Sequence, residues 1–116
     1  PTRRSSDLSI LKSAIEYIDT HYMNESLSLN TAAQVANISA NHFSALFSQN
    51  MGQTFIEYLT ALRMEHAREL LRCTGKRSSE IAAEVGYKDA HYFSYLFKKT
   101  QGMTPSEYRK TREDRG

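Results

Sequence analysis

The sequence predicts an all-α protein in which one long helix separates two copies of a helix-turn-helix unit. The stretch from Thr54 to Cys73 carries apolar residues at helical spacing, and no Pro or Gly interrupts it. The stretch from Ser28 to Tyr58 also aligns without a gap with the stretch from Ser78 to Tyr108. Because a solenoid needs three or more stacked repeats, two copies beside a rod favour a duplicated unit instead.

The long helix has a start signal and a stop signal. Thr54 and Glu57 match a capping box, in which a hydroxyl and a carboxylate accept hydrogen bonds from free amides at a helix start. Gly75 offers a stop just beyond Cys73. At about 1.5 Å per residue, the roughly 18 residues between these signals would span about 27 Å.

Three helices are expected before the long one. The first runs from about Leu8 to Tyr22, with apolar residues on one face. A short, alanine-rich helix begins at Ser28 and gives way to a turn at Asn37. Ser39 then caps a helix that runs through Asn50, and Gly52 is placed to end it in a left-handed conformation.

The second copy follows the same order. A helix begins at Ser78 or Ser79, the chain turns at Gly86, and Asp89 caps a helix that ends before Gly102. A further capping box, with Pro at the first helical position, opens a last short helix through Tyr108. The predicted organisation is a tail at 1–7, a first subdomain at 8–53, a linker helix at 54–74, a second subdomain at 75–112 and a tail at 113–116.

Composition narrows the class of protein. The chain of 116 residues is 40% hydrophobic and 24% charged, which is ordinary for a soluble globular domain. No apolar run is long enough to span a membrane, and the polar start lacks a signal peptide. A single cysteine excludes an internal disulfide and fits a reducing cytoplasm. The start at Pro1 and the basic, serine-rich opening favour a segment of a longer protein.

The charge is unevenly distributed along the chain. Residues 1–62 carry three Lys or Arg and five acidic residues, whereas residues 63–116 carry twelve and eight. The basic half favours a polyanionic partner, although a solvated helical surface would have the same composition.

The second helix of each copy has two distinct faces. At 100° per residue, Phe43, Leu46 and Phe47 share one face, as do Phe93, Leu96 and Phe97, and we assign both sets to the core. The opposite faces carry Asn41, Ser44, Ala45 and Ser48 in copy one, and His91, Ser94, Tyr95 and Lys98 in copy two. Such polar side chains can hydrogen-bond to base edges, while neighbouring lysines can contact phosphate.

Two stretches carry a resemblance to a known family. GYKDAHYFSYLFKKTQGMTPSEYRKTR, from Gly86 to Arg112, resembles the C-terminal signature of AraC/XylS-type transcription regulators. SANHFSALFSQNMGQTFIEYLTALRMEHARELL resembles the preceding part, so the resemblance covers almost the whole chain after residue 8. It implies about seven helices and two helix-turn-helix subdomains that bind successive major grooves of double-stranded DNA to regulate transcription initiation. It also implies a bacterial cytoplasmic protein with RNA polymerase as a candidate partner and a separate regulatory domain.

The resemblance assigns roles to individual residues. The base-reading positions of the family fall on Asn41, Ser44, Ala45, Ala90, His91, Ser94 and Tyr95. The phosphate-contacting candidates are His42, Ser48, Lys98 and Lys99, with Lys88 and the Lys76–Arg77 pair as weaker ones. Copy one departs from the family because residues 39–53 contain no Lys or Arg. Copy two is therefore expected to anchor the protein, and the tandem copies predict one asymmetric promoter site without a palindrome.

Other functions have less support in the sequence. The sequence shows no nucleophile with a partnered base, no phosphate loop and no metal-ligand spacing among its four histidines, so we expect no enzyme, no metal and no cofactor. No Asp-rich loop of the EF-hand type occurs in either copy. A helical protein-interaction module that has lost DNA recognition stays open as the alternative, because the first recognition helix lacks charge.

Overall fold

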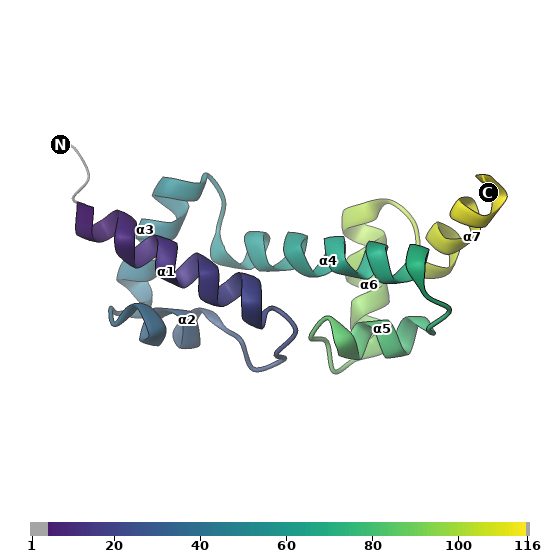
Figure 1. The fold of residues 1–116 in the computed structure, drawn as a ribbon, viewed down its shortest axis with the longest axis horizontal. Helices are drawn as coiled ribbons and strands as arrows, with labels where there is room; N and C mark the ends of the chain where they lie inside the picture. Colours follow the sequence, from purple (N-terminus) through teal and green to yellow (C-terminus); the bar gives the residue numbers. More distant parts are fainter. Residues whose placement is uncertain (1–4, 116) are drawn as a thin grey trace. The chain divides into compact units, whose positions relative to one another are not determined.

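The protein is described by a computed structural model over residues 5–115, and this range is all α-helical, without a strand (Figure 1). The helices are α1 (Ser5–His21), α2 (Leu29–Ala36), α3 (Ala40–Met51), α4 (Phe55–Cys73), α5 (Ser78–Glu84), α6 (Ala90–Gln101) and α7 (Pro105–Arg115). The prediction of an all-α fold with about seven helices is therefore confirmed.

Both terminal helices are longer than the sequence suggested. α1 begins at Ser5 instead of about Leu8, and α7 continues to Arg115 instead of ending near Tyr108. No Pro or Gly lies between Ser106 and Arg115, and Lys, Arg and Glu are good helix formers, so nothing stops the last helix early. Residues 1–4 of the predicted first tail and residue 116 of the second lie outside the described residues.

The chain divides into two compact units, Pro1–Ala61 and Leu62–Gly116, and α4 contributes to both. The first unit packs α1, α2, α3 and the start of α4 around three aromatic rings. Phe55 of α4 lies 6.0 Å from Phe43 and 6.1 Å from Phe47 of α3, ring centre to ring centre, and both pairs meet edge to face. Ala32 and Ala33 of α2 are buried, which allows α2 to lie close to its neighbours.

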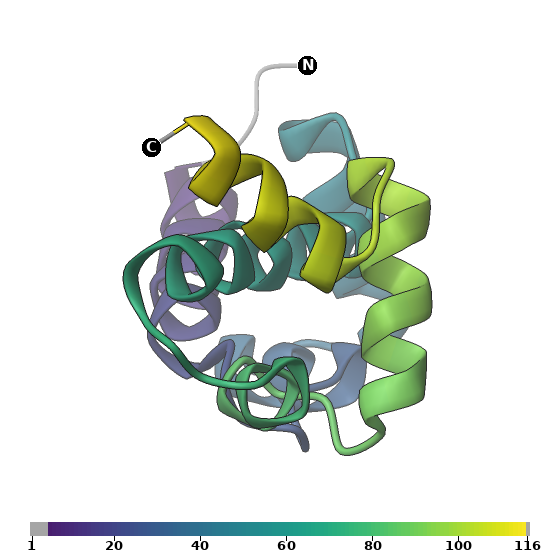
Figure 2. The ribbon, with the colours of Figure 1, turned by 90° about the vertical axis from the view of Figure 1, so that its right-hand side faces the viewer.

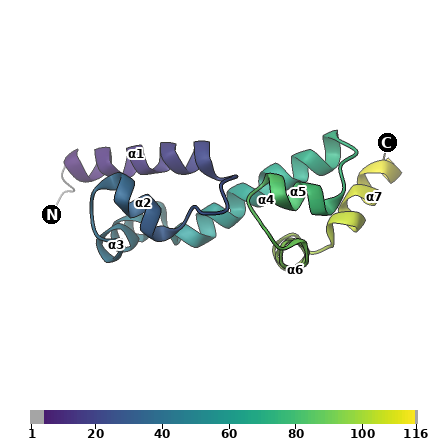
Figure 3. The same ribbon diagram turned by 90° about the horizontal axis from the view of Figure 1, so that it is seen from below.

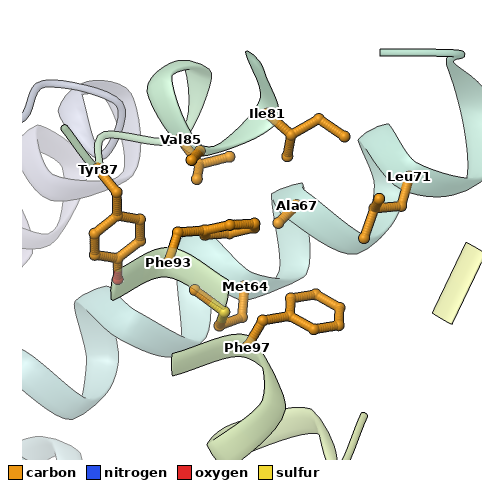
Figure 4. Close-up of a cluster of buried hydrophobic side chains, with 9 residues drawn as sticks. Met64, Ala67, Leu71, Ile81, Val85, Tyr87, Phe93 and Phe97 are labelled. Carbon is orange, nitrogen blue, oxygen red and sulfur yellow. The ribbon is translucent and has the colours of Figure 1, made fainter. Parts of the chain in front are cut away.

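The second unit has an equivalent core (Figure 4). Phe93 and Phe97 of α6 point toward Met64 and Ala67 of α4, and Ile81 of α5 covers them from another side. All five side chains are fully buried. Figures 2 and 3 show α6 lying across α4 and α5, so that its opposite side stays free.

The structure shows that the repeated unit has four helices, with α1 as the counterpart of α4. Tyr58 packs edge to face on Phe47 at 5.5 Å, and Tyr108 packs on Phe97 at 5.7 Å. Each tyrosine hydroxyl also meets the first helix of its own unit. Tyr58 Oη donates a hydrogen bond to Asp19 of α1 at 2.6 Å, and Tyr108 Oη accepts one from Arg72 of α4 at 2.9 Å. α4 is thus the last helix of the first unit and the first helix of the second.

The predicted caps are present. Ser39 Oγ accepts a hydrogen bond from the His42 amide, and the Asp89 carboxylate accepts hydrogen bonds from the His91 and Tyr92 amides. Both predicted capping boxes form, with the Thr54 and Thr104 amides each donating to the Glu three residues later at 2.9 Å. These caps fix where α3, α4, α6 and α7 begin.

The helix ends are less uniform. Gly52 and Gly102 end α3 and α6 with φ of 71° and 84°, left-handed values that a residue with a Cβ adopts only with strain. α4 ends at Cys73, just before Gly75 as predicted, but Gly75 takes no positive φ and so forms no left-handed cap. Arg109 of α7 closes this end instead, donating hydrogen bonds to the carbonyls of Leu71 at 3.2 Å and Thr74 at 3.1 Å.

The capping box of α7 gives a pH-dependent prediction. The backbone and then the side-chain hydrogen bond with Thr104 lower the pKa of Glu107 from its ordinary value of 4.5. The folded state therefore favours the carboxylate, and this stabilisation is present above the unfolded-state pKa and lost as the pH falls through the lowered pKa. We expect Glu107→Gln to have a lower Tm than the parent at neutral pH and a shrinking difference in acid, measured by circular dichroism. A difference in Tm that is constant with pH would contradict this.

Candidate functional site

The turn of each helix-turn-helix unit is closed by backbone hydrogen bonds to the preceding short helix. In the first unit Asn37 takes a left-handed conformation with φ of 61°, and the Ile38 amide donates to the Ala33 carbonyl at 3.1 Å. In the second unit Gly86 takes the positive φ, and the Tyr87 amide donates to the Ala82 carbonyl at 2.8 Å. These turns direct the chain from α2 into α3 and from α5 into α6.

The predicted contact residues of α3 lie on its accessible side. Asn41, His42 and Ala45 are exposed, while Ser44 and Ser48 are half-buried beside the core face. Phe43 and Phe47 are fully buried on the opposite side, as the helical period predicts. This helix contains no charged residue, so its accessible surface offers hydrogen bonds and small apolar groups only.

The predicted contact residues of α6 are larger and more basic. His91, Tyr95, Lys98 and Lys99 are exposed, as is Lys88 in the preceding turn, and Ser94 is half-buried. Ala90 is also half-buried and packs against the core of the second unit. Its methyl group therefore leaves only a small surface for a ligand. The contacts of all these residues with DNA stay predictions.

Lysines concentrate on the C-terminal half of α6. Tyr95, Lys98 and Lys99 line a shallow open pocket, and Lys99 Nζ lies 5.8 Å from the centre of the Tyr95 ring. Lys76, a weaker candidate, instead forms a 2.5 Å ion pair with Glu84. Its charge is thus already balanced within the unit, which leaves Lys98 and Lys99 as the better candidates for contact with phosphate.

The difference in charge coincides with the division into units. The first unit, Pro1–Ala61, carries three basic and five acidic residues, a net charge of −2. The second unit, Leu62–Gly116, carries twelve basic and eight acidic residues, a net charge of +4. A polyanion is therefore attracted to the second unit and weakly repelled by the first.

Sequence reasoning missed one large exposed side chain on α6. Tyr92 is 51% exposed, and its ring lies 5.9 Å from that of Tyr87 and 6.5 Å from that of Tyr95. Tyr92, Tyr95 and Lys99 follow the spacing i, i+3, i+7 of a single helical stripe. This spacing was the available signal, but the predicted contact face included only residues roughly opposite Phe93.

No group of three or more His, Cys, Asp or Glu in the part of the chain that the structure describes could hold a metal ion. Cys73 is exposed at the end of α4. None of the described helices is both long enough and apolar enough to cross a membrane.

This architecture also occurs in known proteins. A family profile described as a helix-turn-helix domain matches residues 32–111. The C-terminal domain of AraT, a response regulator from Geobacillus stearothermophilus, has 42% identity and a TM-score of 0.86, covering 88% of this chain and 84% of that one. The C-terminal domain of the response regulator yesN from Fusobacterium nucleatum has 34% identity and a TM-score of 0.83, covering 84% and 95%.

A curated relative adds sequence support. The lactose operon transcription activator of Staphylococcus xylosus is 38% identical over 72 residues, which are 62% of this chain and 25% of that protein. Two helix-turn-helix units, each presenting the free side of its second helix, define a DNA-binding domain. The chain belongs to the AraC-type helix-turn-helix family of transcription regulators. It spans 16–37% of the length of the curated relatives it matches.

The charge asymmetry gives a prediction for DNA binding. Changing Lys98 and Lys99 together to Ala should weaken binding to every duplex, because two phosphate contacts are lost. The slope of log K against the logarithm of the salt concentration should become shallower by about two units at most. Fluorescence anisotropy over a salt series measures both effects. Lys12→Ala, which removes an exposed lysine of α1, is the control and should change the slope little. Equal affinity of the double variant and the parent would show that Lys98 and Lys99 do not anchor the protein to DNA.

Proposed function

We propose that this chain is the DNA-binding output domain of a longer transcription regulator and that α3 and α6 enter two successive major grooves of one site. The observation that carries the proposal is the pair of helices whose Phe residues are fully buried while the polar residues on the opposite side stay accessible. An α-helix fits the major groove, where each base pair presents a distinct pattern of donors and acceptors.

The length of α4 supports a two-groove arrangement. Its 19 residues would span about 28 Å at about 1.5 Å per residue. Successive major-groove faces on one side of B-DNA lie about 34 to 36 Å apart. A helix of this length that carries one unit at each end is therefore suited to a site whose two halves lie about 10 base pairs apart. Because the copies run in tandem, the site would be asymmetric.

Within this mechanism the two units have different tasks. The second unit, with Lys98 and Lys99, would supply most of the sequence-independent attraction to phosphate. The first unit, with an uncharged α3, would contribute mainly base contacts. Asn41, in the first turn of α3, is the strongest candidate reader because its amide can pair with adenine through two hydrogen bonds.

The longer protein would add a regulatory domain and a second partner. The chain spans 25% of the lactose operon transcription activator and 30% of the melibiose operon regulatory protein, which leaves room in such proteins for a sensing or receiver domain. The former relative is a transcription activator, which favours the same role for the longer regulator, and RNA polymerase is a candidate second partner. Such a regulator would act where bacterial DNA lies, in the cytoplasm.

A protein-interaction module is the competing function, and the net charge of −2 on the first unit favours it. The salt dependence of the affinity for duplex DNA distinguishes the two functions. A DNA-binding domain loses affinity for duplex DNA steeply as ionic strength rises, because bound phosphates release counterions. Selection of binding sites from random duplexes, repeated at two salt concentrations, tests the proposed function directly. Failure to enrich any sequence at low salt would leave the interaction module as the better account.

Asn41→Ala tests the reading of bases. The substitution should relax the preference at one or two adjacent base pairs and cost about 1 to 3 kcal/mol on the selected site. Asn41 is exposed, so the fold should not change. Parallel site selections with the variant and the parent provide the measurement. Identical sequence preferences would show that Asn41 reads no base.

The two-groove mechanism predicts that the length of α4 determines which spacing of the two half-sites on DNA the protein can bind. Four alanines inserted after Ala61 would lengthen the helix by about 6 Å and rotate one end by about 40° relative to the other. This position separates Leu59, in the first unit, from Met64, in the core of the second, so both sets of packing contacts are kept. We expect unchanged helicity by circular dichroism and loss of most specific affinity on the selected site.

Duplexes with altered spacing provide the control for this insertion. If the register is what the insertion disturbs, one to three base pairs added between the half-sites, at about 3.4 Å each, should restore part of the affinity. A folded insertion variant that binds the original site as tightly as the parent would show that one unit alone binds DNA.

A further inference from the structure

The second unit contains a row of aromatic rings that has no counterpart in the first. Tyr87, which is buried in the turn, meets Tyr92 edge to face at an interplanar angle of 66°. Tyr92 in turn lies nearly parallel to Tyr95, at 26°, and Lys99 Nζ lies over the Tyr95 ring. The equivalent positions of copy one hold Asn37, His42, Ala45 and Gln49, none of which has a benzene ring.

This row connects the protein core to the surface of α6. Tyr87 is 9% exposed and belongs to the core cluster of the second unit, whereas Tyr92 is 51% and Tyr95 58% exposed. Contacts between aromatic rings favour defined geometries, so the buried ring orders the exposed ones. Side chains that are already ordered lose less conformational entropy on binding. Two exposed tyrosines in ordered orientations can therefore bind a ligand with a smaller loss of conformational entropy than two freely rotating ones.

The width of the major groove decides what these rings would meet. The groove is about 12 Å wide, and an α-helix with its side chains is about 10 to 12 Å across. A helix of this size fills the groove, so side chains along its flanks must touch the sugar-phosphate walls. At 100° per residue Tyr92 lies within 20° of Lys99 on one flank of α6, and about 60° from Tyr95, which is closer to the face predicted to read bases.

From this geometry we propose that Tyr92 is a further DNA-contacting residue, whose hydroxyl donates a hydrogen bond to a backbone phosphate on the strand that Lys99 also contacts. Its ring also holds the Tyr95 ring in the orientation that meets the bases. This inference rests on the proposed function, because it requires α6 to lie in the major groove. It assigns a phosphate contact to an uncharged side chain that the family resemblance did not include.

Tyr92→Phe tests the hydroxyl alone, since it keeps the ring row. Loss of one hydrogen bond should weaken binding to both the selected and a random duplex by roughly 2- to 10-fold. The salt slope should not change, because a neutral hydroxyl releases no counterion on binding, whereas Lys99→Ala should lower the slope by about one unit. Tyr17→Phe, on α1, is the matched control and should bind as the parent does.

Tyr92→Ala tests the positioning of Tyr95. This variant should show the same loss on random DNA and, in addition, a relaxed preference at the base pair that Tyr95 contacts, seen by site selection. If Tyr92→Phe binds both duplexes as tightly as the parent, or loses affinity only for the selected site, the phosphate contact is refuted. If the parent itself binds no duplex with a salt-dependent affinity, the proposed function fails, and this result is separate from the behaviour of the variants.

Discussion

The structure depends on one helix that supplies apolar side chains to two cores. Phe55 and Leu59 of α4 are buried in the first unit, and Met64, Ala67 and Leu71 are buried in the second. Most of the stability of a helix in a protein comes from tertiary packing of its apolar face, so α4 owes its stability to packing in both units. Disruption of either core therefore removes support from a helix that the other core needs. The folding of the two units is coupled through this shared element.

The repeat in the sequence predicted most of this architecture, but it hid the role of α1. The alignment at an offset of 50 runs from Ser28/Ser78 to Tyr58/Tyr108 and leaves out α1, which matches α4 only at an offset of 53 residues. At that offset Leu11 corresponds to Met64, and Ile18 to Leu71, which share burial but not identity. The loop after α1 is also longer than the loop after α4. Ala14 and Ala67 are identical and buried at this offset, but so few identities in a shifted register could not reveal the correspondence that packing shows.

The faces of the recognition helices could be predicted because they depend on the helical period alone. The features that escaped prediction depend on side chains that meet across loops or turns. Lys76 and Glu84 are eight residues apart and belong to no helical pairing rule, yet their contact decides which lysines stay available. The Arg109 cap on α4 likewise joins residues 35 or more positions apart, so local signals pointed to Gly75 instead.

The separation between buried and accessible residues on α3 and α6 has an evolutionary consequence. Phe43, Phe47, Phe93 and Phe97 hold the units together, while Asn41, Ala45 and His91 are exposed and contribute little to that packing. Exposed substitutions of this kind usually change stability by less than about 0.5 kcal/mol. If these residues read bases as proposed, single mutations that leave the scaffold intact can change the target preference. Substitutions in the uncharged α3 would then be tolerated while the lysines of α6 preserve attraction to DNA, so a lineage could move between promoters without an unfolded or non-binding intermediate.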